Sequence, residues 1–96
     1  MGNAGGKGIK IKIDEDMSQG VYANLAMVAH GESEFVLDFM FLQPGRAEAK
    51  VGARVVLSPR QTKRLLSALD DNIGRYETRF GTIPSSGGPG PDDVVH

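Results

Sequence analysis

The residues that could carry nucleophilic chemistry gather around His30. Ser33 follows it closely, and Glu32 and Glu34 lie beside the serine, so a hydroxyl, an imidazole and a carboxylate occur together. A serine nucleophile needs a base within hydrogen-bond reach and a third group that orients that base. The surrounding residues are typical of a hairpin turn, which does not hold three groups in a fixed geometry. We therefore interpret His30 as a solvated turn residue and predict no catalytic residues.

Metal-dependent and thiol chemistry have no support in the composition. The 96 residues include no cysteine and two histidines, of which His96 is the last residue printed. A zinc site needs three or four nitrogen, sulfur or carboxylate ligands at suitable spacings. Paired acidic residues such as Asp70 and Asp71 are sequence neighbours that point in different directions on a helix. We predict neither a metal nor a cofactor.

Basic residues form the second set with a conceivable function. Lys10 and Lys12 alternate along one predicted strand, and Lys50 and Arg54 share one face of another. With Arg46 in a turn, they would give a positive sheet surface of the kind that single-strand nucleic-acid binding combines with aromatic stacking. The net charge of −1 gives no overall field that favours such a partner.

Aromatic residues that could stack bases share one face of the predicted sheet. A row of phenylalanines opposite an amphipathic helix is more typical of a hydrophobic core than of a stacking platform. We therefore interpret the row as core, and keep base stacking as the alternative. Its members are Tyr22, Phe35, Phe39 and Phe41.

Four segments have the patterns of β-strands. Residues 9–13 read Ile-Lys-Ile-Lys-Ile, a strict alternation that predicts one buried and one solvated face. The other three segments are apolar and are separated by the turn signals Gly31-Glu32 and Pro44-Gly45. They are residues 21–30, 34–42 and 50–57. We expect the four strands to form an antiparallel meander.

A two-residue turn at Gly31-Glu32 would set the register of the central hairpin. In that register Val28 lies opposite Phe35, and both faces of the sheet carry apolar side chains, which is unusual for so small an antiparallel sheet. One helix covers one face, so the second face would be an exposed hydrophobic patch. We predict that this face forms a homodimer interface. Its residues are Val21, Leu25, Met27, Val36, Met40 and Leu42.

Asp38 lies on the predicted interface face. A buried carboxylate needs a hydrogen-bonded partner, and Arg54 on the neighbouring strand is the candidate. The alternative is an edge-exposed charge that opposes aggregation. We favour the paired interpretation.

One long amphipathic helix is predicted after residue 57. Ser58 is suited to the N-cap, Pro59 to the first helical position and Gln61 to a capping box, and Gly81 stands where a C-terminal cap belongs. At 100° per residue the apolar side chains form one stripe, which we expect to cover one face of the sheet. The stripe comprises Thr62, Leu65, Leu66, Leu69, Ile73, Tyr76 and Phe80.

The predicted fold class is α+β, a four-stranded antiparallel sheet followed by one C-terminal helix (ββββα). Residues 1–7 are expected to be a flexible glycine-rich leader, residues 8–83 a single domain, and residues 84–96 a disordered tail. No segment has the hydrophobic stretch of a secretory signal or a membrane span. We therefore expect a cytoplasmic protein without membrane contact.

Several short blocks carry a resemblance to a known family over about residues 9–83. The chain resembles the short prokaryotic proteins of domain-of-unknown-function family DUF3467, which brings no assigned activity and so implies only the domain boundaries. The blocks are Tyr22-Ala-Asn24, Glu34-Phe-Val-Leu-Asp-Phe39, Pro44-Gly45-Arg46, Ala49-Lys50-Val51, Leu57-Ser-Pro59, Asp71-Asn72-Ile73 and Tyr76-Glu77.

The expected element order is also similar to the repeat of Pur-alpha and Whirly proteins, which associate and bind single-stranded nucleic acid. That similarity is one of topology, and topology alone does not carry function. The sequence favours a small homodimeric, non-enzymatic interaction module with an unidentified protein partner. A single-stranded nucleic-acid-binding protein is the first alternative and an enzyme the second.

Overall fold

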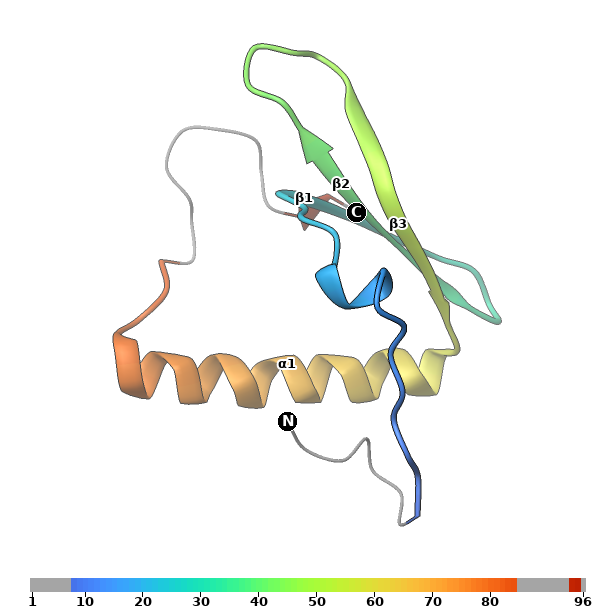
Figure 1. The fold of residues 1–96 in the computed structure, drawn as a ribbon, viewed down its shortest axis with the longest axis vertical. Helices are drawn as coiled ribbons and strands as arrows, with labels where there is room; N and C mark the ends of the chain where they lie inside the picture. The colour runs from blue at the N-terminus through green and yellow to red at the C-terminus, as the bar shows by residue number, and fades with distance from the viewer. Residues whose placement is uncertain (1–7, 85–93, 96) are drawn as a thin grey trace.

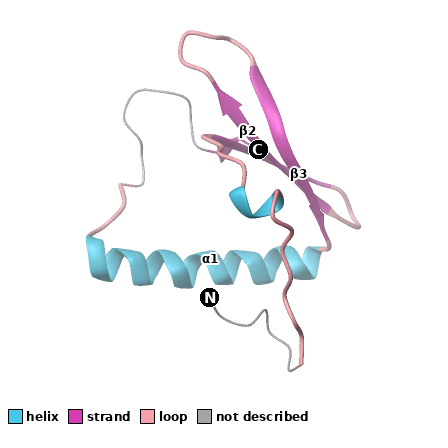
Figure 2. Cartoon of the chain, in the orientation of Figure 1, coloured by secondary structure: helices cyan, strands magenta, loops and turns pink. Residues whose placement is uncertain are grey.

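A computed structural model describes residues 8–84 and 94–95 of the chain (Figure 1). Within them, three antiparallel strands precede one long helix, and a 3₁₀ turn, η1 (Met17–Gln19), precedes the sheet. The strands are β1 (Leu25–His30), β2 (Phe35–Leu42) and β3 (Ala49–Leu57), and the helix is α1 (Pro59–Phe80). A two-residue strand, β4 (Val94–Val95), runs parallel to β1, which gives the sheet order β3-β2-β1-β4. Figure 2 shows the strands in magenta and the helices in cyan.

The expected ββββα order is wrong, because in residues 8–84 the antiparallel sheet has three strands, which one helix follows (βββα). Residues 9–13 run without regular structure, and Ile9, Ile11 and Ile13 are 54%, 57% and 64% exposed. A strand forms only when a neighbouring strand pairs with its backbone, and no described strand lies beside this segment. The alternating pattern is present, but none of the strands that the structure describes pairs with it.

The β1–β2 hairpin has a longer turn than predicted. Residues 31–34 form the connection, closed by the Gly31 N–H donating to the Glu34 carbonyl at 2.9 Å. Val28 therefore lies opposite Leu37 rather than Phe35. Because side chains alternate with a period of two, this two-residue shift leaves each side chain on its predicted face.

The predicted strand 21–30 begins only at Leu25, because a side chain replaces the backbone ladder before it. Asn24 Nδ2 donates to the Leu42 carbonyl at 3.0 Å, and Asn24 Oδ1 accepts from the Leu42 N–H at 2.8 Å. The amide thus satisfies both backbone groups of Leu42, as a paired residue would. This contact fixes the end of the hairpin.

A β-bulge at Gly52 separates the two halves of β3. Asp38 pairs with Arg54 and Phe39 with Ala53, but Met40 pairs with Val51, so Gly52 is the extra residue. A Cβ at this position would lie 2.9 Å from the side chain of Val21, so a larger residue here would require Val21 to shift. The bulge reverses the alternation of β3, and Lys50 and Arg54 consequently lie on opposite faces.

The helix has the predicted limits. Ser58 Oγ accepts a hydrogen bond from the Gln61 N–H at 3.1 Å, and Pro59 is the first helical residue. At the other end Gly81, with φ of 105°, donates its N–H to the Glu77 carbonyl at 2.9 Å. Local capping therefore fixes both ends of α1.

The expectation that the helix covers a sheet face is wrong. Figure 1 shows α1 extending from the end of β3 beside the sheet, and no residue of α1 is buried. Only Ser58 separates β3 from α1, so the helix starts directly at the end of this edge strand. Among the described residues, the buried ones are Leu37, Asp38 and Met40, all on the central strand β2.

Candidate functional site

The Asp38–Arg54 ion pair is the best-defined polar contact of the sheet. Arg54 Nε donates to Asp38 Oδ1 at 2.7 Å and Arg54 Nη2 to Asp38 Oδ2 at 2.8 Å, so the pair is bidentate. These hydrogen bonds lower the pKa of Asp38 from its ordinary value, against a smaller opposing effect of desolvation, and they raise the pKa of Arg54. The predicted partnership is confirmed, and it engages Nε and Nη2 of the guanidinium group.

The five predicted nucleic-acid-binding residues do not form one surface. Lys10 and Lys12 lie in the extended segment outside the sheet, and Arg54 lies on the face opposite Lys50. The structure brings together only Arg46 and Lys50, at the connection between β2 and β3.

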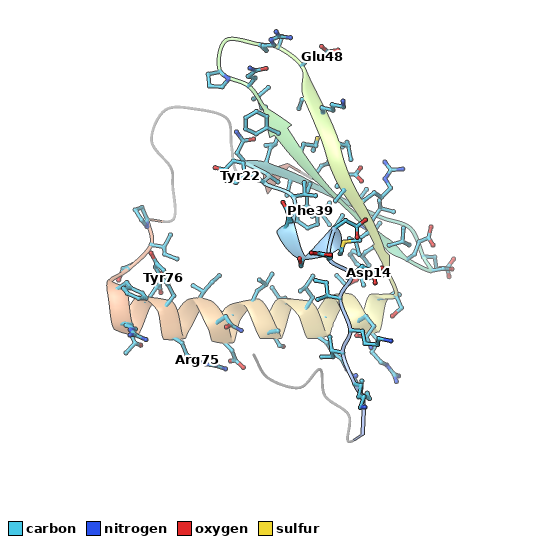
Figure 3. The ribbon with its side chains drawn as sticks, in the orientation of Figure 1. Asp14, Tyr22, Phe39, Glu48, Arg75 and Tyr76 are labelled. Carbon is cyan, nitrogen blue, oxygen red and sulfur yellow. The ribbon has the colours of Figure 1, made fainter. Side chains whose placement is uncertain are left out.

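A hollow of about 470 Å³ lies at that connection. It holds two positive charges, one negative charge and an aromatic ring. Its lining comprises Phe41, Gln43, Arg46, Glu48, Ala49 and Lys50. Figure 3 shows Glu48 at the outer tip of the β2–β3 hairpin. The hollow can accept a small planar or anionic group, although the carboxylate of Glu48 opposes a strongly anionic one.

An aromatic pair adjoins this hollow. The rings of Tyr22 and Phe41 meet edge to face with centroids 6.0 Å apart, and Tyr22 is 77% exposed. The sequence predicts that both rings belong to the core. Because α1 does not cover the sheet face that carries them, Tyr22 and Phe41 are instead accessible. The bulge at Gly52, which sequence reasoning did not foresee, places Lys50 opposite Phe41 and so on the aromatic face.

The predicted dimer-interface residues differ in how far they are covered. Met40 is buried, Met27 is 40% exposed, and Val21 lies outside the strands with its side chain at Gly52. The remaining three, Leu25, Val36 and Leu42, are half-buried. The sheet face is thus partly covered within one chain.

The apolar stripe of α1 is the larger uncovered surface. Its aliphatic and aromatic side chains from the third turn onward are between 45% and 66% exposed. They are Leu66, Leu69, Ile73, Tyr76 and Phe80. Figure 3 shows Tyr76 near the far end of the helix and Arg75 on another side of it. Apolar side chains that are aligned in this way and left in water mark an interaction surface.

The stripe ends at an apolar hollow near the start of the helix. The hollow has a volume of about 420 Å³ and lies where β2 approaches the first turns of α1. Its lining is almost entirely apolar and comprises Phe35, Pro59, Thr62, Lys63 and Leu66. A large apolar side chain is the natural occupant of such a hollow.

His30, the residue considered as a catalytic base, contacts an aromatic side chain. The His30 ring stacks on Phe35 with centroids 5.4 Å apart. Among the described residues, no group of three or more histidine, cysteine, aspartate or glutamate side chains could hold a metal ion. Of the helices described, none has the length and apolar character needed to cross a bilayer.

These observations define a small α+β chain whose long helix presents an uncovered apolar stripe. The family model described as "Protein of unknown function (DUF3467)" matches residues 1–85, and the chain belongs to this family. The predicted resemblance is therefore confirmed. No curated protein matches the chain, and no solved structure matches it.

Proposed function

We propose that this chain works as a homodimer and serves as a non-enzymatic protein-interaction module. The observation that carries the proposal is the exposed apolar stripe of α1 in a chain whose described part buries only two apolar side chains, Leu37 and Met40. Ile9, Ile11 and Ile13 add further exposed apolar surface.

Within the residues that the structure describes, one copy buries no residue of α1. Ordering a residue costs about 1–2 kcal/mol of backbone entropy, and most of the stability of a helix in a protein comes from packing of its amphipathic face rather than from helix propensity. The 22 residues of α1 include Gly74, two threonines and two aromatic residues, which are weaker helix formers than alanine. The helix therefore needs a surface that covers its stripe.

A second copy supplies that surface most simply, because each copy brings an identical stripe and a two-fold pairing covers both at once. The partly exposed sheet face, including Met27, would remain for a further contact. The outer edge of β3 has no paired strand among the described residues, so it could accept an extended segment of a protein partner.

Sedimentation equilibrium of the purified chain at micromolar concentration tests the proposal. A mass near twice 10.3 kDa supports it. A mass of one copy across the concentration range, with the helical circular dichroism of α1 retained, would overturn it.

Single-stranded nucleic-acid binding is the second candidate, and one specific observation favours it. Tyr22 and Phe41 form an accessible aromatic pair beside Lys50 and Arg46. Base stacking on an aromatic ring next to a phosphate-binding cation is the usual arrangement for such binding. Glu48 and the engagement of Arg54 with Asp38 weigh against it.

Fluorescent single strands measured across a salt series test this candidate. A binder loses affinity steeply as salt rises, and Lys50→Gln should then weaken binding while Arg64→Gln, on the exposed side of α1 away from the stripe, serves as the control for loss of one positive charge. Absence of binding at low salt removes the candidate.

A further inference from the structure

We propose that the two copies of α1 pair antiparallel, in a register that places Thr62 of one copy opposite Phe80 of the other. This inference rests on the proposed homodimer and specifies its interface. The two-fold axis would cross the helix pair at the level of Asp71, which lies midway along the sequence between Thr62 and Phe80 of each helix.

The spacing of the stripe supports this register. Six of its residues follow one another at intervals of four, three, four, three and four positions, which is the repeat of a coiled-coil seam. They are Thr62, Leu66, Leu69, Ile73, Tyr76 and Phe80. This series of intervals reads the same in both directions, so two antiparallel copies bring every member opposite another member. The layers are Thr62 with Phe80, Leu66 with Tyr76, and Leu69 with Ile73, each formed twice.

The apolar hollow at the start of α1 fits the outermost layer. Thr62 and Leu66 line it together with Phe35, and the register brings Phe80 of the second copy to Thr62. Phe80 is 66% exposed within its own chain. The ring of one copy would therefore enter the hollow of the other, and the same contact would recur at the opposite end of the pair.

The charges that flank the seam agree with an antiparallel pair. Lys63, Asp70 and Glu77 lie along one side of the seam. In an antiparallel pair the residues on this side of one helix approach the same side of the other helix, so Lys63 lies beside Glu77 of the second copy. In a parallel pair Lys63 would lie level with its own equivalent, and this attraction would be absent. Asn72 meets Asn72, and two amides can exchange hydrogen bonds. One contact opposes the register, because the two Asp70 carboxylates approach across the axis.

Cysteine cross-linking tests the register directly, since the chain has no cysteine of its own. We would prepare Leu69→Cys and Ile73→Cys separately and oxidise each alone and in an equal mixture. A disulfide needs Cα atoms about 4.4–6.8 Å apart. Of the possible pairings between these two positions, the register brings only position 69 of one copy opposite position 73 of the other. Covalent dimers confined to the mixture are the expected result.

Other outcomes overturn the register. Cross-linking of each variant alone indicates a parallel pair. Absence of cross-linking, while sedimentation shows that the reduced variants remain dimeric, shows that the stripes are covered elsewhere and leaves the homodimer itself intact. A monomeric wild-type chain removes both proposals. Leu66→Cys mixed with Tyr76→Cys provides a second pair if either central variant fails to fold.

Discussion

Asp38 on β2 and Arg54 on β3 hold two adjacent strands together through a bidentate ion pair, with distances of 2.7 and 2.8 Å. The two ends of this pair differ in environment, because the side chain of Asp38 is 6% exposed and that of Arg54 is 63% exposed. A carboxylate that is covered in this way depends on its cation, whereas the cation can also be hydrated. The pair therefore acts mainly by allowing Asp38 to remain charged at the centre of the sheet.

Asp38→Asn should lower the urea midpoint of unfolding at neutral pH, because the variant loses both charge-assisted hydrogen bonds. Circular dichroism at matched protein concentration measures the change. Asp71→Asn, on the exposed side of α1, is the control and should leave the midpoint unchanged. An unaltered midpoint in Asp38→Asn would show that the ion pair adds nothing to stability.

The same pair sets the sign of a pH dependence. The pKa of Asp38 is lowered in the folded state, so its contribution is present above the unfolded carboxyl value of about 3.9 and is lost as pH falls through the folded value. The difference in urea midpoint between wild type and Asp38→Asn should accordingly shrink at low pH. A difference that persists unchanged below both values would contradict this assignment.

Ser58→Ala should reduce the free energy of unfolding by about 1 kcal/mol, because the Gln61 N–H loses its capping acceptor. Urea titration at fixed protein concentration gives the value. Ser67→Ala, within the helix and exposed, removes a hydroxyl without removing a cap and should not destabilise. Equal losses in the two variants would argue against the capping role.

Gly74→Ala should stabilise the protein by about 1 kcal/mol, since glycine is a poor helix former and an added Cβ here has no neighbour within 4 Å. Thermal unfolding measures the change in stability, and sedimentation measures whether the dimer is retained. The dimer should persist, because Gly74 lies outside the seam. Loss of association would instead show that a second chain approaches the helix closely at this glycine.

Ile73→Glu should weaken self-association by at least about 30-fold, because a central interface residue contributes about 2 kcal/mol or more and the new carboxylate would be desolvated. Ser67→Glu places the same charge on the opposite side of α1 and should leave the dissociation constant close to that of wild type. Sedimentation equilibrium gives the dissociation constant of the dimer for both variants. Equal dissociation constants would exclude the stripe as the interface.

The elements defined by local chemistry could be predicted from the sequence. Ser58, Pro59 and Gly81 fix the ends of α1 because capping needs only neighbouring residues. The Asp38–Arg54 pair was also predictable, because a carboxylate on a central strand requires a cation within reach. The helix caps involve residues within one helical turn, and the ion pair joins residues on two adjacent strands.

Features that depend on distant pairing could not be predicted. Residues 9–13 alternate as a strand does, but the pattern does not say whether another strand is available to pair with them. The extra residue at Gly52 has a close contact with Val21, far away in sequence, and it moved Lys50 to the aromatic face. The apolar stripe of α1 follows from helical periodicity, but that periodicity does not say which surface the stripe contacts, and no residue of α1 is buried in its own chain.

Amide hydrogen exchange along α1 in the purified protein tests most directly whether a second copy covers the stripe. If it does, the amides from Leu66 to Tyr76 should be among the most slowly exchanging in the chain, although one copy alone leaves these side chains exposed. Exchange along this helix as fast as in the turn at residues 31–34 would show that nothing covers it, and would contradict the account.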